Sequence, residues 1–106
     1  MIVVNRFRVP EAEQDPFRGD LERAHETLAM QQGYVEGRIG RNVDDPELWV
    51  LVTAWEGPGA YRRALSAYDV KLTAVPTLSR ALDEPSAYET VEPGTTLNRA
   101  GARSLG

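Results

Sequence analysis

The sequence predicts a small α+β domain in which one antiparallel four-stranded sheet is covered by two helical segments. Three observations lead to this prediction. Residues 2–9 and 48–55 alternate with strand spacing, residues 11–32 carry an apolar stripe with helical spacing, and Gly, Pro or Asp separates each predicted element from the next. With 106 residues, of which 42% are hydrophobic, the chain has the size and composition of one globular domain.

The first predicted strand covers residues 2–9. Its side chains alternate between an apolar face, which also carries Asn5, and a face with Arg6 and Arg8. Pro10 ends this strand because its ring removes a backbone donor.

The segment 11–32 is predicted to be an amphipathic helix, and Gly33 is placed where it would stop. Its apolar side chains recur every three or four residues: Phe17, Leu21, Ala24 and Leu28. This stripe is expected to pack on the sheet.

Two further strands are predicted to form a hairpin, at residues 34–43 and 48–55, around an Asp-Asp-Pro turn. In the first of them, Val35, Ile39 and Val43 are expected to share one face. The second is apolar on both faces, and such a strand needs a cover on each side. Since two helices cover only one face of a sheet, we expect a second subunit to cover the other face in a homodimer.

The C-terminal half is predicted to contain a second helical region and a short fourth strand. Residues 57–82 read as mostly helical, with an interruption near Pro76, and residues 86–92 read as a strand. Residues 1–92 then form the domain, and 93–106 are expected to be a disordered tail. The resulting order, β-α-β-β-α-β, is that of ferredoxin-like domains.

Composition excludes several function classes. A formal charge of −4 without a basic stripe argues against a nucleic-acid partner, and no segment has the length and hydrophobicity to cross a membrane. The first residues lack the apolar run of a signal peptide, so a cytoplasmic location is expected. There is no cysteine and one histidine, His25, which predicts no metal site. No phosphate-binding glycine motif is present, and neither a flavin nor a nicotinamide cofactor is expected.

Three short motifs resemble the antibiotic biosynthesis monooxygenase superfamily. They are Asn5 on a Val-Val-Asn strand, the Gly33-Tyr34-Val35 that ends the first helix, and Trp55-Glu56 followed after an interval by Ala60-Tyr61. The resemblance covers about residues 1–92. It implies a dimeric α+β barrel, and it implies either oxygenation of aromatic compounds without a cofactor or, in other members, heme degradation.

The anthrone-oxidising members of this superfamily have pocket residues at three spacings around the Trp-Glu pair. The corresponding positions here are Leu51, where those proteins have Asn, and Trp55 and Tyr61, which match. Asn5 on the neighbouring strand is the side chain that could replace the missing amide. In the heme-degrading members, the corresponding Trp and axial His positions are Ala64 and Ala74 here, so heme breakdown is not expected.

We therefore expect a pocket between sheet and helices. Tyr61 and Asn5 would hold a substrate oxygen and His25 would act as a base. The expected substrate-binding residues are Trp55, Phe7, Leu51 and Tyr68. These residues also have structural interpretations. Asn5 is a buried amide bonded to neighbouring backbone, the tyrosines form a core stripe, Trp55 packs in the core or at a dimer contact, and His25 is a partly exposed helix residue.

The sequence thus supports a first hypothesis, a cofactor-independent monooxygenase that oxidises an electron-rich, polyketide-like or quinol-like small molecule with O₂. The second hypothesis is a non-catalytic dimer that binds a small molecule or assists another protein. A heme-binding protein with His25 as ligand ranks third.

Overall fold

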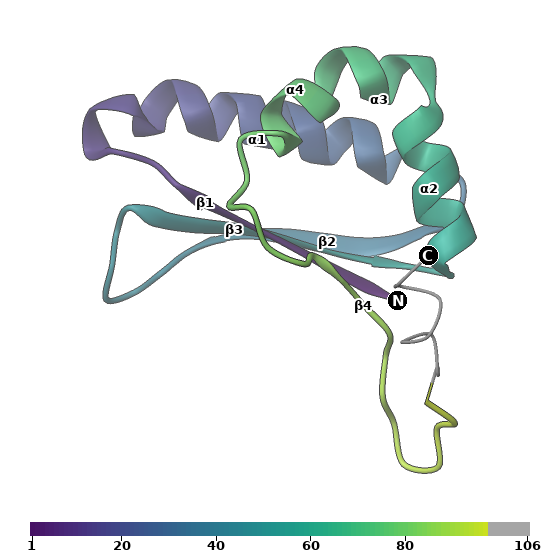
Figure 1. Ribbon diagram of the computed structural model, residues 1–106. Helices are drawn as coiled ribbons and strands as arrows, with labels where there is room; N and C mark the ends of the chain where they lie inside the picture. The colour runs from purple at the N-terminus through teal and green to yellow at the C-terminus, as the bar shows by residue number, and fades with distance from the viewer. Residues whose placement is uncertain (98–106) are drawn as a thin grey trace.

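In the computed structural model, which describes residues 1–97, four antiparallel strands form one sheet in the order β2-β3-β1-β4. The strands are β1 (Ile2–Arg8), β2 (Tyr34–Arg41), β3 (Leu48–Trp55) and β4 (Ala87–Tyr88). The helices are η1 (Glu11–Glu13), α1 (Gln14–Ala29), α2 (Pro58–Ser66), α3 (Tyr68–Thr73) and α4 (Val75–Leu78). All helices lie on the same side of the sheet, as Figure 1 shows. The predicted fold class and element order are confirmed.

The core lies between α1 and one face of the central strands. Along β3 every second side chain is buried, beginning with Trp49 and ending with Trp55, as strand periodicity predicts. The four apolar residues of the predicted α1 stripe are all at most 1% exposed. Burial of this stripe removes apolar area from water, which is the main stabilising term in folding.

The opposite face of the sheet carries no helix (Figure 1) and is also apolar. Val4, Val50 and Val52 alternate with the buried residues and are only half-buried. A hollow of about 380 Å³ lies on this face, and Ile2, Val52 and Ala54 are among the residues that line it. The expectation that a second subunit covers this face stays a prediction.

The prediction that Val35, Ile39 and Val43 share one face of the second strand is wrong for Val35 and Val43. A β-bulge between Tyr34 and Glu36 shifts the register, so that Val35 is 59% exposed while Ile39 still packs against the core. Val43 lies beyond the end of β2 and is 95% exposed. A bulge inserts one residue and therefore exchanges the two faces of the strand around it.

The second helical region is three short helices. Ala67 has extended backbone angles, with φ −67° and ψ 142°, and separates α2 from α3. This break changes the helical phase, so Tyr68 does not share a face with Tyr61 and is 78% exposed. The interruption expected near Pro76 lies at Ala74, and Pro76 is accommodated in the first turn of α4.

The fourth strand is shorter than the predicted 86–92. Only Ala87 and Tyr88 pair with β1, flanked by hydrogen bonds from Val4 N to Ser86 O (2.7 Å) and from Leu82 N to Arg6 O (2.8 Å). The chain after β4 extends away from the helices, past the level of the sheet (Figure 1). Residues 98–106, most of the predicted tail, lie outside the described residues. Within residues 1–97, no helix is both long and apolar enough to cross a membrane.

Candidate functional site

A cavity of about 400 Å³ opens between β1 and the helices that follow β3. Its lining comes from three places in the chain: Asn5 on β1, Tyr61 and Leu65 on α2, and Val75, Leu78 and Ser79 in and just after α4. The volume falls in the range of small-molecule pockets, about 300–1,000 Å³. Apolar walls with a few polar groups are typical of such pockets.

Asn5 reaches this cavity because of the register between β1 and β3. It pairs directly with Leu51, so the two Cα atoms face one another across the ladder. The side chain lies on the helix-facing side of the sheet and is 8% exposed. Asn5 thus brings a side-chain amide to the cavity from the position that pairs with Leu51.

Tyr61 lies in the second turn of α2 and is half-buried. Burial raises the pKa of its phenol above the ordinary value of 10.0, and the neighbouring Asn5 amide lowers this pKa by less. The phenol consequently keeps its proton at neutral pH. Tyr61 and Asn5 together present hydrogen-bond donors to the cavity, which suits a substrate oxygen that carries or develops negative charge.

Trp55 packs against the ring of Tyr61 but does not line the cavity. Its indole is 2% exposed, lies 5.3 Å from the Tyr61 ring between centroids, and donates from Nε1 to Thr53 Oγ1 at 2.8 Å. Phe7 and Leu51 are at most 1% exposed and belong to the core. Tyr68 points to solvent. None of the four expected substrate-binding side chains is therefore among the cavity residues.

His25 does not line the cavity either. Its Nε2 lies 2.7 Å from the hydroxyl of Tyr34, and the Tyr34 ring in turn contacts the Trp55 indole, with ring centroids 5.5 Å apart. His25 is linked to Tyr61 through the successive contacts of Tyr34 and Trp55. A role for His25 as the base of this cavity thus has no support from the contacts.

Four lining residues were not predicted from the sequence to belong to the site: Leu65, Val75, Leu78 and Ser79. Leu65 follows Tyr61 by one helical turn, and this spacing could have identified it. The others come from α4, whose position depends on the break at Ala74 and on the return of the chain to β1. No local sequence signal specifies that return.

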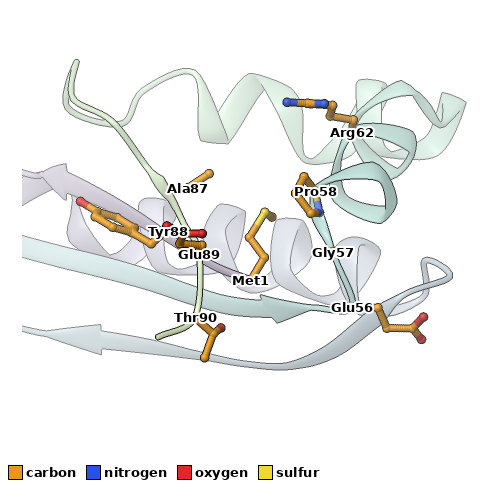
Figure 2. Close-up of a pocket in the computed structure, with 9 residues that line it drawn as sticks. All are labelled: Met1, Glu56, Gly57, Pro58, Arg62, Ala87, Tyr88, Glu89 and Thr90. Atoms are coloured by element: carbon orange, nitrogen blue, oxygen red, sulfur yellow. The ribbon is translucent and has the colours of Figure 1, made fainter. Parts of the chain in front are cut away.

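A second cavity, of about 390 Å³, lies between the start of α2 and the β4 segment. Figure 2 shows Met1 at its centre, with Pro58 and Arg62 on the α2 side and Tyr88 on the other. Most of its lining residues are exposed, and they include carboxylates and a guanidinium. It lacks a buried polar side chain comparable to Asn5, so the cavity at Asn5 and Tyr61 is the stronger candidate.

Among residues 1–97, no cluster of three or more His, Asp or Glu side chains is arranged to hold a metal ion. The ionisable side chain that lines the main cavity is the Tyr61 phenol. This cavity can therefore bind and orient a neutral or ionised aromatic through hydrogen bonds.

Comparison with known proteins agrees with this fold. The family model described as antibiotic biosynthesis monooxygenase matches residues 1–74, and the chain belongs to that family. Among solved structures, it is similar to SnoaB, a cofactor-independent oxygenase from Streptomyces nogalater, with 26% identity, a TM-score of 0.69, and coverage of 91% of this chain and 94% of that one. It is also similar in fold to a conserved protein from Methanosarcina mazei Go1, with 19% identity, a TM-score of 0.66, and coverage of 81% and 84%. A search of curated proteins finds no match.

Proposed function

We propose that this protein is a cofactor-independent monooxygenase that uses O₂ to oxidise an electron-rich aromatic compound of the polyketide or quinol type. The observation that carries the proposal is the joint placement of Asn5 and Tyr61 in a cavity whose other walls are mostly apolar. Family membership and the similarity to the oxygenase SnoaB support it.

The lining of the cavity narrows the class of substrate. It offers hydrogen-bond donors and apolar walls, but neither a carboxylate nor an imidazole lines it. A substrate must therefore lose its proton to water, which favours compounds whose carbanion or phenolate forms readily near neutral pH. Desolvation by Leu65, Val75 and Leu78 then destabilises the free anion, and the Tyr61 and Asn5 donors stabilise the charge on its oxygen.

The proposed reaction needs no group beyond the substrate and O₂. The substrate anion transfers one electron to O₂, and the resulting substrate radical and superoxide combine to form a C–O bond. The peroxide anion takes a proton and eliminates water, which leaves one oxygen atom on the substrate as a carbonyl.

Oxygen uptake with an anthrone model compound tests the proposal. Purified protein freed of metals and flavin should consume O₂ above the spontaneous rate. Tyr61→Phe removes one donor to the developing oxyanion and should lower kcat by roughly 10²-fold, the usual effect of losing such a donor. Tyr68→Phe makes the same chemical change at an exposed tyrosine and should leave the rate unchanged.

Uptake that never exceeds the spontaneous rate for a panel of anthrones and quinols would contradict the proposal. It would favour a second candidate, a dimer that binds such a compound without oxidising it. The absence of a carboxylate or imidazole from the cavity lining is the observation that favours this candidate. A binding protein would show ligand-induced thermal stabilisation, lost in Tyr61→Phe, with no oxidised product.

The proposed functional unit is a homodimer joined through the helix-free face of the sheet. This face is apolar because it carries the half-buried Val4, Val50 and Val52. The central strand β3 would then be covered by the helices on one face and by the second subunit on the other. A sheet-to-sheet contact related by a two-fold axis would bury these residues in both copies.

A further inference from the structure

Four side chains form a chain of successive contacts that begins at the cavity: Tyr61, Trp55, Tyr34 and His25. We refer to them as the aromatic row. The ring centroids of Tyr61 and Trp55 are 5.3 Å apart, and those of Trp55 and Tyr34 are 5.5 Å apart in an edge-to-face arrangement. His25 Nε2 lies 2.7 Å from the Tyr34 hydroxyl. The row begins at the cavity and ends at a half-buried pair between α1 and β2.

The second tryptophan shows that this arrangement is specific to Trp55. Trp49 lies on the same face of β3, six residues earlier. Its ring contacts are with Phe17, at 5.8 Å, and with the Arg41 guanidinium, at 5.9 Å. Within residues 1–97, the ring contacts of Trp49 thus include no tyrosine, whereas Trp55 lies between two.

Hydrogen bonding makes the two ends of the aromatic row chemically different. The Trp55 indole donates to the hydroxyl of Thr53, which is not a base. Tyr61 interacts with the Asn5 amide, which is not a base either. Tyr34 alone is paired with an imidazole, and an unprotonated His25 can accept the phenol proton.

Loss of an electron from a tyrosine makes its phenol strongly acidic, so the tyrosine with a proton acceptor is the easiest to oxidise. Burial, and to a lesser extent the Glu36 carboxylate, raises the pKa of Tyr34 above 10.0, so that its proton is present before oxidation. When one residue of the aromatic row is oxidised, the radical should therefore localise on Tyr34.

Gly37 provides the space for the terminal pair. A Cβ atom at this position would lie 2.6 Å from His25 Nε2 and 2.7 Å from the Tyr34 hydroxyl oxygen, closer than real Cβ contacts. A side chain at position 37 would therefore displace one or both partners. The hydrogen bond between His25 and Tyr34 depends on glycine there.

The geometry points to a further function of the aromatic row: it carries an oxidising equivalent from the cavity to Tyr34, with His25 as the proton acceptor. In the central step, the Trp55 radical cation takes one electron from Tyr34. The Tyr34 phenol proton moves at the same time to His25, which leaves neutral Trp55, a Tyr34 phenoxyl radical and protonated His25. A soluble one-electron reductant such as ascorbate returns Tyr34 to the phenol.

The oxidant that would load the row is an oxygen-centred peroxyl radical in the cavity, and this source rests on the proposed function. A substrate radical that escapes recombination with superoxide adds a second O₂ to form this peroxyl radical. The peroxyl radical takes a hydrogen atom from Tyr61, which lines the cavity, and becomes a hydroperoxide. The Tyr61 radical then takes one electron from Trp55 and one proton from water. Such a route would remove radicals that escape the substrate before they damage the cavity.

Laser flash photolysis tests the row without substrate, so its outcome does not depend on the oxygenase proposal. The experiment uses the full-length Trp49→Phe protein, in which Trp55 is the remaining tryptophan. A flash ejects an electron from the indole, a scavenger removes that electron, and transient absorption follows the indole radical and the tyrosyl radical. We expect the indole radical to convert to a tyrosyl radical at a rate independent of protein concentration.

Variants in this background identify the acceptor. Tyr34→Phe and His25→Gln should each lower the rate of conversion by at least about tenfold, which corresponds to about 1.4 kcal/mol in activation free energy. Tyr61→Phe should change this rate by less than about twofold. His25→Gln keeps a hydrogen-bond acceptor but lacks a base. Gly37→Ala keeps every redox-active residue and should slow the conversion by displacing the pair.

Circular dichroism of each variant establishes that it is folded before the flash experiment. The complementary protein, Trp55→Phe with Trp49 retained, should show no rapid conversion. Conversion that survives Tyr34→Phe, that disappears in Tyr61→Phe, or that depends on protein concentration would overturn the inference.

Discussion

Gly33 offers a sharp test of how the start of α2, and with it the cavity, is positioned. It has φ +90°, and a Cβ atom there would lie 2.4 Å from the Cβ of Ala60, which directly precedes Tyr61. Its carbonyl also accepts a hydrogen bond from Glu56 N at 2.8 Å. Gly33→Ala therefore introduces backbone strain and a steric clash at one point.

The two costs can be estimated separately. A non-glycine residue in the left-handed region loses about 1–2 kcal/mol. Overpacking in a closed site costs about 1–3 kcal/mol, so we expect Gly33→Ala to lower the free energy of unfolding by about 2–5 kcal/mol. This is a large part of the total for a small domain, about 5–15 kcal/mol.

A double-mutant cycle separates the clash from the strain. Ala60→Gly removes the clashing Cβ and by itself costs about 0.5–1 kcal/mol in helix stability. The double variant should therefore be more stable than the sum of the single effects predicts by about 1–3 kcal/mol, the clash energy. Urea unfolding measures each free energy, provided that the slope with denaturant stays constant.

Two results would refute this reasoning. A loss below about 1 kcal/mol in Gly33→Ala would mean that the helix start adjusts freely and does not fix Tyr61. Additive effects in the double variant would mean that Ala60 is not the group that the new methyl meets.

Two further predictions concern the sheet surface. Val52→Glu places a charge on the helix-free face and should convert the dimer to a monomer, as measured by light scattering. The control Val43→Glu, at a 95% exposed position, should leave the mass unchanged. A monomeric parent protein or a dimeric Val52→Glu protein would contradict this prediction. Arg6 donates hydrogen bonds to the Glu84 carboxylate from Nε and Nη2, at 2.8 and 2.6 Å. These bonds lower the pKa of Glu84 below its ordinary value of 4.5. The ion pair therefore stabilises the fold above pH 4.5, and its contribution is lost as the pH falls through the lowered pKa. Glu84→Gln should therefore lower the thermal midpoint at pH 7, with the difference from the parent vanishing in acid, and a difference independent of pH would refute it.

The sheet and its core were predictable because strand alternation and helical stripes follow directly from burial. Residues 48–55 alternate in burial as the sequence predicts, and the bounds of β3 match. The sequence did not give the register between β1 and β3, which pairs Asn5 with Leu51.

The remaining differences come from single residues that change the phase of an element. The bulge at Val35 turned that side chain outward, and the extended Ala67 separated Tyr68 from Tyr61. Neither residue is a glycine or proline, so nothing local announces the change. The cavity was predicted through Asn5 and Tyr61 but not through α4, because contacts between distant segments place that helix.

The central claim is that ligands bind at the cavity of Asn5 and Tyr61. Titration of ¹⁵N-labelled protein with an anthraquinone, the inert oxidised form of an anthrone, tests it most directly by amide chemical shifts. We predict that shifts concentrate at the cavity residues Asn5, Tyr61, Leu65, Val75, Leu78 and Ser79, and that Tyr61→Phe weakens binding. Shifts centred instead on the cavity around Met1 and Tyr88, or no saturable shifts with any ligand of this class, would contradict the claim.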